Sequence, residues 1–295
     1  MRSLWSLQYK KSPNFKIQDA NLLNLPFNED LYMSTNSLNI AWFDSHSYFE
    51  TSASVKEAMK KSVELLRSLG HRLIQIPQED LPDLESAMTL YMSIMNTTTM
   101  PARNSFLKSE SPIQNSDWNH KFYNMSSLKR KLHTLFSFKQ KRFNHIMHNS
   151  GPKSTYEHGN MFKLRTSILK QFMTFVKQKK IDAVICPAFP IPAPKTADTE
   201  KLFIGNAYSI FMGVIGLPTA VVPIDSVRNL IGEGVENNEK EMYESEHSDE
   251  ITCIAKRNLE GCENLSVGVQ ISCLPFKDEL ALNIAKQIQT LNSLQ

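Results

Sequence analysis

The chain has 295 residues, of which 41% are hydrophobic and 21% charged, and this composition excludes a wholly disordered or fibrous protein. Its 33 Lys and Arg residues nearly balance its 30 Asp and Glu residues, so the net charge of +3 does not indicate nucleic acid as a partner. The N-terminus lacks a secretory signal, and no apolar run reaches the roughly 18 residues that a bilayer-spanning helix needs. We therefore expect an intracellular protein without a transmembrane helix.

The first predicted elements form a strand, helix and strand unit. Short apolar runs at 38–43 and 71–76 flank a segment, 52–70, in which apolar residues recur at helical spacing. Ser52 or Ser54 is placed to cap the start of this helix. The segment is thus an α/β unit whose helix packs one face on the core.

Further helices and strands alternate in the second half of the chain, and a proline-rich extended loop follows the strand that ends at Pro187. This alternation predicts an α/β fold in which helices cover a sheet. The predicted elements are a helix at 161–180, a strand at 182–187, a helix at 208–216, strands at 219–224 and 265–273, and a helix at 277–291.

Two segments of opposite charge interrupt this pattern. From Lys121 to Lys180 there are 14 Lys or Arg residues against one acid, whereas Asp225 to Glu263 carries 11 acids against four bases. The acidic segment, 225–263, lacks periodicity in its centre and is predicted to be a solvated loop.

Part of the basic segment, residues 121–150, combines helical recurrence of apolar residues with lysines and arginines. Such a pattern suits a helix that lies on a membrane surface. It equally suits a surface helix whose apolar stripe faces the protein core, and no nucleic-acid-binding module accompanies it. The expected membrane contacts are Leu128, Lys129, Arg130, Leu132, Leu135 and Phe136.

Catalytic and metal-binding motifs are missing from the sequence. It contains no G-x-S-x-G, no phosphate-binding loop, no G-x-G-x-x-G and no H-E-x-x-H, and its four cysteines form no zinc-ligand spacing. His71 is expected to satisfy a helix terminus, and Cys186 to be a buried, inert thiol. The remaining histidines of interest are expected to add surface charge in the basic segment: His133, His145 and His148.

Several short motifs, taken in order, resemble the C-terminal half of the fatty acid amide hydrolases, which belong to the amidase signature family. Residues 26–32, the unit from 38 to 71 and the basic segment resemble the stretch that follows the catalytic region and the membrane cap of that family. The remaining matches are a D-x-[LV]-[LI]-x-P strand at 182–187, a G-L-P-x-x-x-x-P turn and strand at 216–223, and a final strand and helix at 267–280.

This resemblance implies a partial amidase signature domain over residues 1–295, with a mixed β-sheet covered by helices. It implies a serine hydrolase that cleaves fatty acid amides with a Ser-Ser-Lys triad and no cofactor or metal. No G-G-S-S-G segment is present, so no residue here is assigned a catalytic role. The substrate-binding residues implied by the resemblance are Phe143, Met147, Phe203, Asn206 and Ile210.

The leading hypothesis is therefore part of a fatty acid amide hydrolase-like enzyme that is inactive alone because it lacks the triad. The alternative is a non-catalytic protein of the same ancestry that binds lipids or a membrane surface. A third, weaker hypothesis is an amidase that acts on a small polar amide. Phe143 and Phe203 argue against it, because they indicate an apolar channel. The expected partners are a lipid amide and a membrane surface, with peripheral membrane association and no nucleic acid, and a homodimer stays open.

Overall fold

The computed structural model describes residues 26–106, 125–126, 128–129, 132, 142, 154–232 and 238–294. Five strands form one mixed sheet in the order β2-β1-β3-β5-β4. β1 pairs in parallel with β2 and β3, and β5 pairs antiparallel with β3 and β4. The predicted α/β fold with a mixed sheet is thus confirmed. The strands are β1 (Asn39–Trp42), β2 (Arg72–Gln75), β3 (Ala183–Pro187), β4 (Thr219–Ser226) and β5 (Ser266–Cys273).

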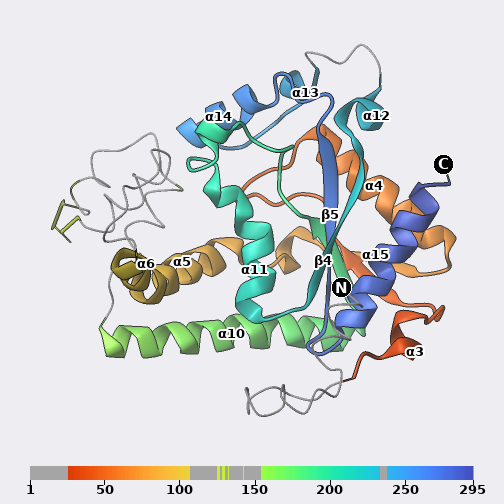
Figure 1. Ribbon diagram of the computed structural model, residues 1–295, viewed down its shortest axis with the longest axis horizontal. Helices are drawn as coiled ribbons and strands as arrows, with labels where there is room; N and C mark the ends of the chain where they lie inside the picture. The colour runs from red at the N-terminus through yellow and green to blue at the C-terminus, as the bar shows by residue number, and fades with distance from the viewer. Residues whose placement is uncertain are drawn as a thin grey trace.

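Helices cover both faces of this sheet (Figure 1). Successive side chains of a strand point to opposite faces, so Val184 lies in one hydrophobic core and Ile185 in the other. One core is formed with α4 (Ala53–Ser68) and α15 (Asp278–Asn292). The opposite core is formed with α5 (Leu84–Ile94), α10 (Thr155–Lys179), α11 (Ala207–Ile215) and α14 (Glu250–Asn258).

Most predicted elements agree with the structure to within one or two residues, and α10 is the exception. It begins six residues before the predicted start because Ser154 and Glu157 form a capping box, in which each side chain bonds the other's backbone N–H. At the far end of α11, Gly216 adopts a left-handed conformation with φ 76°, which ends the helix and starts β4.

The prediction that 225–263 is a loop is wrong for much of this segment. It contains α12 (Val227–Ile231), α13 (Asn238–Glu241) and α14. Two of its acidic side chains, Glu239 and Asp249, are buried, as is Tyr243. These elements are held by contacts with residues far away in the chain, which a local periodicity search does not detect.

A second helical segment was not predicted. α5 continues through a π-helical turn, η2 (Met95–Thr99), into α6 (Met100–Phe106). Such π turns occur preferentially where a helix contributes to a functional site. The remaining short elements are α3 (Glu29–Tyr32), η1 (Gln78–Asp80), η4 (Thr196–Asp198) and η5 (Phe203–Asn206). Within the described residues, no helix is both long and apolar enough to cross a bilayer.

Candidate functional site

A groove of about 720 Å³ lies where three helical segments meet on one side of the sheet, and we call it the α10–α11 groove. Its walls come from α5 with η2, from α10, and from η5 with α11, so its lining combines residues that are far apart in sequence. Most of them are apolar or aromatic. The lining residues are Tyr91, Ile94, Met95, Thr98, His158, Phe162, Arg165, Phe203, Asn206, Ser209, Ile210, Gly213 and Val214.

Three predicted substrate-binding residues, Phe203, Asn206 and Ile210, all line this groove. The Asn206 side-chain amide donates to the carbonyl oxygen of Phe203 at 3.0 Å, so η5 closes on itself before α11 begins. A Cβ at position 205 would lie only 2.7 Å from the Phe189 ring. Glycine at this position therefore lets the turn pack against the neighbouring loop. The structure thus brings these three residues together on one wall of the groove, and their role in binding substrate stays a prediction.

Two further predicted substrate-binding residues, Phe143 and Met147, lie outside the described residues, so their expected role stays a prediction. The same holds for three expected membrane contacts, Arg130, Leu135 and Phe136. The other expected membrane contacts are described and exposed: Leu128 with 67% of its surface accessible, Leu132 with 45%, and Lys129.

The walls from α5 and η2 were missed in the sequence, although a signal was present. Asp83 accepts a hydrogen bond from the backbone N–H of Ser86 and caps α5, and apolar residues follow at helical spacing. Arg165 was also missed. In the sequence it is one of 14 basic residues in its segment, and nothing local distinguishes it from the solvated ones.

The polar atoms of the groove are few. Arg165 Nε donates to the carbonyl oxygen of Val214 at 2.5 Å, and Ser209 Oγ donates to that of Ala188 at 2.8 Å. The Tyr91 and Phe203 rings pack with their centroids 6.2 Å apart. An apolar hollow with a small number of placed polar groups is typical of a site for a small organic ligand.

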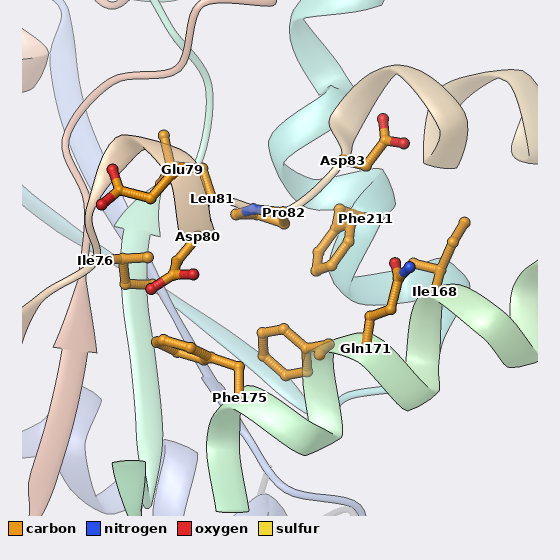
Figure 2. Close-up of a pocket in the computed structure, with 11 residues that line it drawn as sticks. Ile76, Glu79, Asp80, Leu81, Pro82, Asp83, Ile168, Gln171, Phe175 and Phe211 are labelled. Carbon is orange, nitrogen blue, oxygen red and sulfur yellow. The ribbon is translucent and has the colours of Figure 1, made fainter. Parts of the chain in front are cut away.

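A second, smaller cavity of about 250 Å³ lies between η1, α10 and α11. Figure 2 shows the rings of Phe175 and Phe211 directed into it from α10 and α11, with Asp80 and Glu79 on the opposite side. Among the predicted substrate-binding residues that the structure describes, none lines this cavity and three line the groove, so the groove is the better candidate for the site.

The two residues for which a structural role was expected have one. His71 is buried; its Nδ1 accepts from the Leu38 N–H at 3.2 Å, and its Nε2 lies 2.7 Å from Gln287 Oε1. Cys186 is fully buried on β3, and burial raises the pKa of its thiol to about 12 despite a hydrogen bond from Gln270. Its thiol is therefore protonated at neutral pH and is not poised to act as a nucleophile.

The described ranges hold no cluster of metal-binding side chains. There, no three His, Cys, Asp or Glu side chains come together in a group that could hold an ion. In the part of the chain with described side chains, the groove is lined by one arginine and one histidine and by no carboxylate. The described lining accordingly suits a ligand with an apolar body and a polar group at one side.

Comparison with known proteins places these features in a family context. The Amidase family model matches residues 8–282. Fatty acid amide hydrolase 1 of Caenorhabditis elegans is 23% identical over 268 residues, which cover 89% of this chain and 44% of that protein. Fatty-acid amide hydrolase 1 of Sus scrofa is 20% identical over 284 residues, which cover 92% of this chain and 46% of that protein. The chain thus spans less than half the length of these curated relatives.

Solved structures share the fold at low sequence identity. A fatty acid amide hydrolase superposes with a TM-score of 0.68 and 16% identity, over 98% of this chain and 46% of that one. A bacterial aryl acylamidase of the amidase signature family gives a TM-score of 0.55 and 12% identity, over 95% of this chain and 49% of that one. The sheet and its covering helices are therefore an arrangement that these amidase structures have in common.

Proposed function

Because this chain belongs to the Amidase family, we propose that it forms the acyl-binding part of a hydrolase that cleaves fatty acid amides to a fatty acid and an amine or ammonia. The observation that carries this proposal is the α10–α11 groove. Its volume of about 720 Å³ falls within the range of roughly 300 to 1,000 Å³ that is usual for organic ligands. The names of the relatives and the residues that line the groove support a fatty acyl chain as its occupant.

The apolar wall of η5 and α11 supports this choice of ligand. Phe203, Ile210 and Val214 face the hollow and are only partly buried, so an occupant would remove further apolar surface from water. Burial of apolar surface stabilises a complex by about 25 cal/mol for each Å². A flexible hydrocarbon chain gains this stabilisation without the desolvation cost that a small polar amide would bring.

Catalysis, in this proposal, depends on residues that this sequence does not contain. The resemblance to the family implies a Ser-Ser-Lys triad within a glycine- and serine-rich segment, and the 295 residues include no G-G-S-S-G. Cys186, the thiol at the end of β3, is buried and protonated and does not replace that nucleophile. We therefore expect the isolated chain to bind acyl ligands and not to hydrolyse them.

The first experiment treats the purified chain with a fluorophosphonate probe and measures oleamide hydrolysis in parallel. We expect neither labelling nor turnover. Labelling together with turnover would overturn the inactive assignment, because it requires a serine nucleophile within this chain.

The second experiment measures binding of dodecanamide by isothermal titration calorimetry. Ile210→Trp places an indole in the groove and should weaken binding about tenfold or more, since it displaces the ligand from its apolar contacts. Leu164→Trp is the matched control, because Leu164 is exposed on α10 and does not line the groove. Equal affinity of both variants and the parent chain would overturn the assignment of the groove.

The alternative is a lipid- or membrane-binding protein of the same family that takes no part in catalysis. Both hypotheses assign ligand binding to the groove, and the transcript sequence distinguishes them. An in-frame G-G-S-S-G region upstream of Met1 supports the enzyme, whereas a transcript without that region supports the binding protein.

Peripheral membrane association belongs to the same proposal. Leu128 and Leu132 are exposed, and Lys129 beside them is exposed as well. Exposed leucines next to basic side chains can enter the boundary of an anionic bilayer. A groove that receives its ligand from a membrane would benefit from such an attachment.

A further inference from the structure

Arg165 is unusual among the residues of the α10–α11 groove. Among the lining residues that the structure describes, it is the single Lys, Arg, Asp or Glu. It is half-buried, and its Nε donates to the carbonyl oxygen of Val214 near the C-terminal end of α11. This hydrogen bond fixes the plane of the guanidinium group at the edge of the groove.

The two terminal nitrogens of Arg165 have no carboxylate partner within the described ranges. Arg142, by contrast, is buried and binds both carboxylate oxygens of Asp249, at 2.7 and 2.6 Å. A guanidinium carries five N–H donors, of which four lie on the terminal nitrogens. The terminal nitrogens of Arg165 are not among the buried, unpaired polar atoms of the described ranges, so they reach solvent at the groove. An anion in the groove can therefore accept charge-assisted hydrogen bonds from them.

Other groups on α10 extend the polar side of the groove. His158, Phe162 and Arg165 are spaced four and three residues apart, which puts them on one face of the helix. Nδ1 of His158 is buried and has no hydrogen-bond partner among the described residues. The polar atoms of α10 thus face the apolar wall formed by η5 and α11.

We propose that the groove selects acyl ligands that carry a carboxylate, and that Arg165 binds this carboxylate. The proposal rests on the proposed function, because it assigns the polar end of the ligand whose chain occupies the groove. The planar guanidinium matches a carboxylate with two parallel N–H···O bonds, which a neutral amide cannot accept in the same way. The carboxylate can belong to a free fatty acid, which is the hydrolysis product, or to an amino acid joined to the chain through an amide.

The test compares three ligands with the same twelve-carbon chain: dodecanamide, dodecanoate and N-dodecanoylglycine. Each is titrated into the 295-residue chain by calorimetry, below the concentration at which it forms micelles. At least one carboxylate ligand should bind about tenfold more tightly than dodecanamide, the factor expected for a hydrogen bond to a charged group. The tighter of the two carboxylates shows whether the anion lies at the chain end or beyond an amide.

Arg165→Gln should remove this preference, so that the carboxylate ligands bind the folded variant no more tightly than dodecanamide does. Lys163→Gln removes the same charge from an exposed neighbour on α10 that does not line the groove, and it should leave the preference unchanged. Thermal melting of both variants reports any loss of the Arg165 hydrogen bond to α11.

The outcomes separate this inference from the proposed function. Equal affinity for all three ligands, or a preference that survives Arg165→Gln in the folded variant, overturns the role of Arg165 and leaves the acyl groove intact. A chain that binds none of the three ligands overturns both. Lower stability of Arg165→Gln with an unchanged ligand preference would mean that Arg165 only closes the end of α11.

Discussion

Arg142 and Asp249 show at the scale of single residues how the two oppositely charged segments meet. Both side chains are more than nine-tenths buried. Arg142 also donates to the Tyr48 carbonyl oxygen and to Thr252 Oγ1, and its guanidinium lies 5.3 Å from the centre of the Phe49 ring. The basic and the acidic segment are thus joined by a specific buried ion pair.

The pKa of Asp249 follows from these contacts. Burial alone raises the pKa of this carboxyl, but hydrogen bonds from Arg142 and Thr252 and the charge of Arg142 outweigh that effect, so the pKa lies below its usual range. An Asp pKa that is lower in the folded state stabilises the fold above the unfolded value of about 3.9. This stabilisation is lost as the pH falls through the folded pKa.

We expect Asp249→Asn to lower the free energy of unfolding at neutral pH by about 3 kcal/mol, because it leaves the Arg142 charge buried without a counter-ion. Asn is itself a good N-cap, so the start of α14 should be preserved. Urea unfolding measures the change. Glu250→Gln is the control; Glu250 pairs with Lys201 at the surface, and its loss should cost less than about 1 kcal/mol. An unchanged midpoint for Asp249→Asn would contradict the importance of the pair.

Predictions for single residues agreed with the structure where the neighbouring sequence determines whether a side chain is buried. Cys186 ends an apolar strand run and is buried, as expected. His71 follows a helix end and has a structural role, but its side chain contacts Leu38 and Gln287 rather than the end of α4. Arg142 and Arg165 could not be singled out, because burial of a basic side chain depends on partners such as Asp249 and Val214, which lie far away in the chain.

At the scale of elements, α4 depends on a cap from a distant helix. Ser52 occupies the N-cap position but makes no side-chain capping bond. Instead, the Glu239 carboxylate accepts from the Ser54 N–H at 3.0 and 3.1 Å and from Ser54 Oγ at 2.5 Å. A carboxylate satisfies the free N–H groups of a helix start and interacts favourably with its dipole. α13 and α4 are therefore held together by this contact.

Glu239→Ala should lower the free energy of unfolding by about 2 kcal/mol, since it removes hydrogen bonds to a charged acceptor that is 3% exposed. Glu241→Ala changes an exposed acid on the same short helix and should have little effect. Chemical unfolding of the two variants makes the comparison. Equal losses would show that α13 stabilises the chain only through its helix content.

This contact also explains why the acidic segment was misread. Its central residues lack a helical apolar stripe, and Glu239 is buried by what it binds in α4, 185 positions away. α5, η2 and α6 were missed although Leu84, Ala87 and Met88 carry helical spacing that the sequence displays. Local sequence patterns could not have corrected the prediction for the acidic segment, but they could have revealed α5.

At the scale of the whole molecule, a groove suited to an apolar ligand is accompanied by exposed leucines next to basic side chains. We expect the chain to sediment with vesicles that contain phosphatidylserine, and to do so less at high salt, because basic groups are attracted to anionic headgroups. Leu128→Asp should reduce the bound fraction about tenfold, since it removes an inserted side chain and adds a like charge.

Leu294→Asp is the control for this experiment. Leu294 is 77% exposed, comparable to Leu128, but it lies beyond α15 at the C-terminal end of the described chain. Equal binding of the two variants would show that exposed leucines in general, rather than the basic segment, bring the protein to the vesicle. No sedimentation of the parent chain would contradict peripheral attachment.

The sequence by itself determined the α/β class and the positions of all five strands, because alternation, helical spacing and turn residues act locally. Phe203 and Ile210 were singled out by the family resemblance instead, and their role in binding substrate stays a prediction. Only the tertiary structure decided that α5, α10 and α11 line one groove, that Arg165 is among its lining residues, and that Glu239 caps α4. Each of these depends on atoms brought together from distant parts of the chain, and the free energy of such contacts is absent from any local pattern.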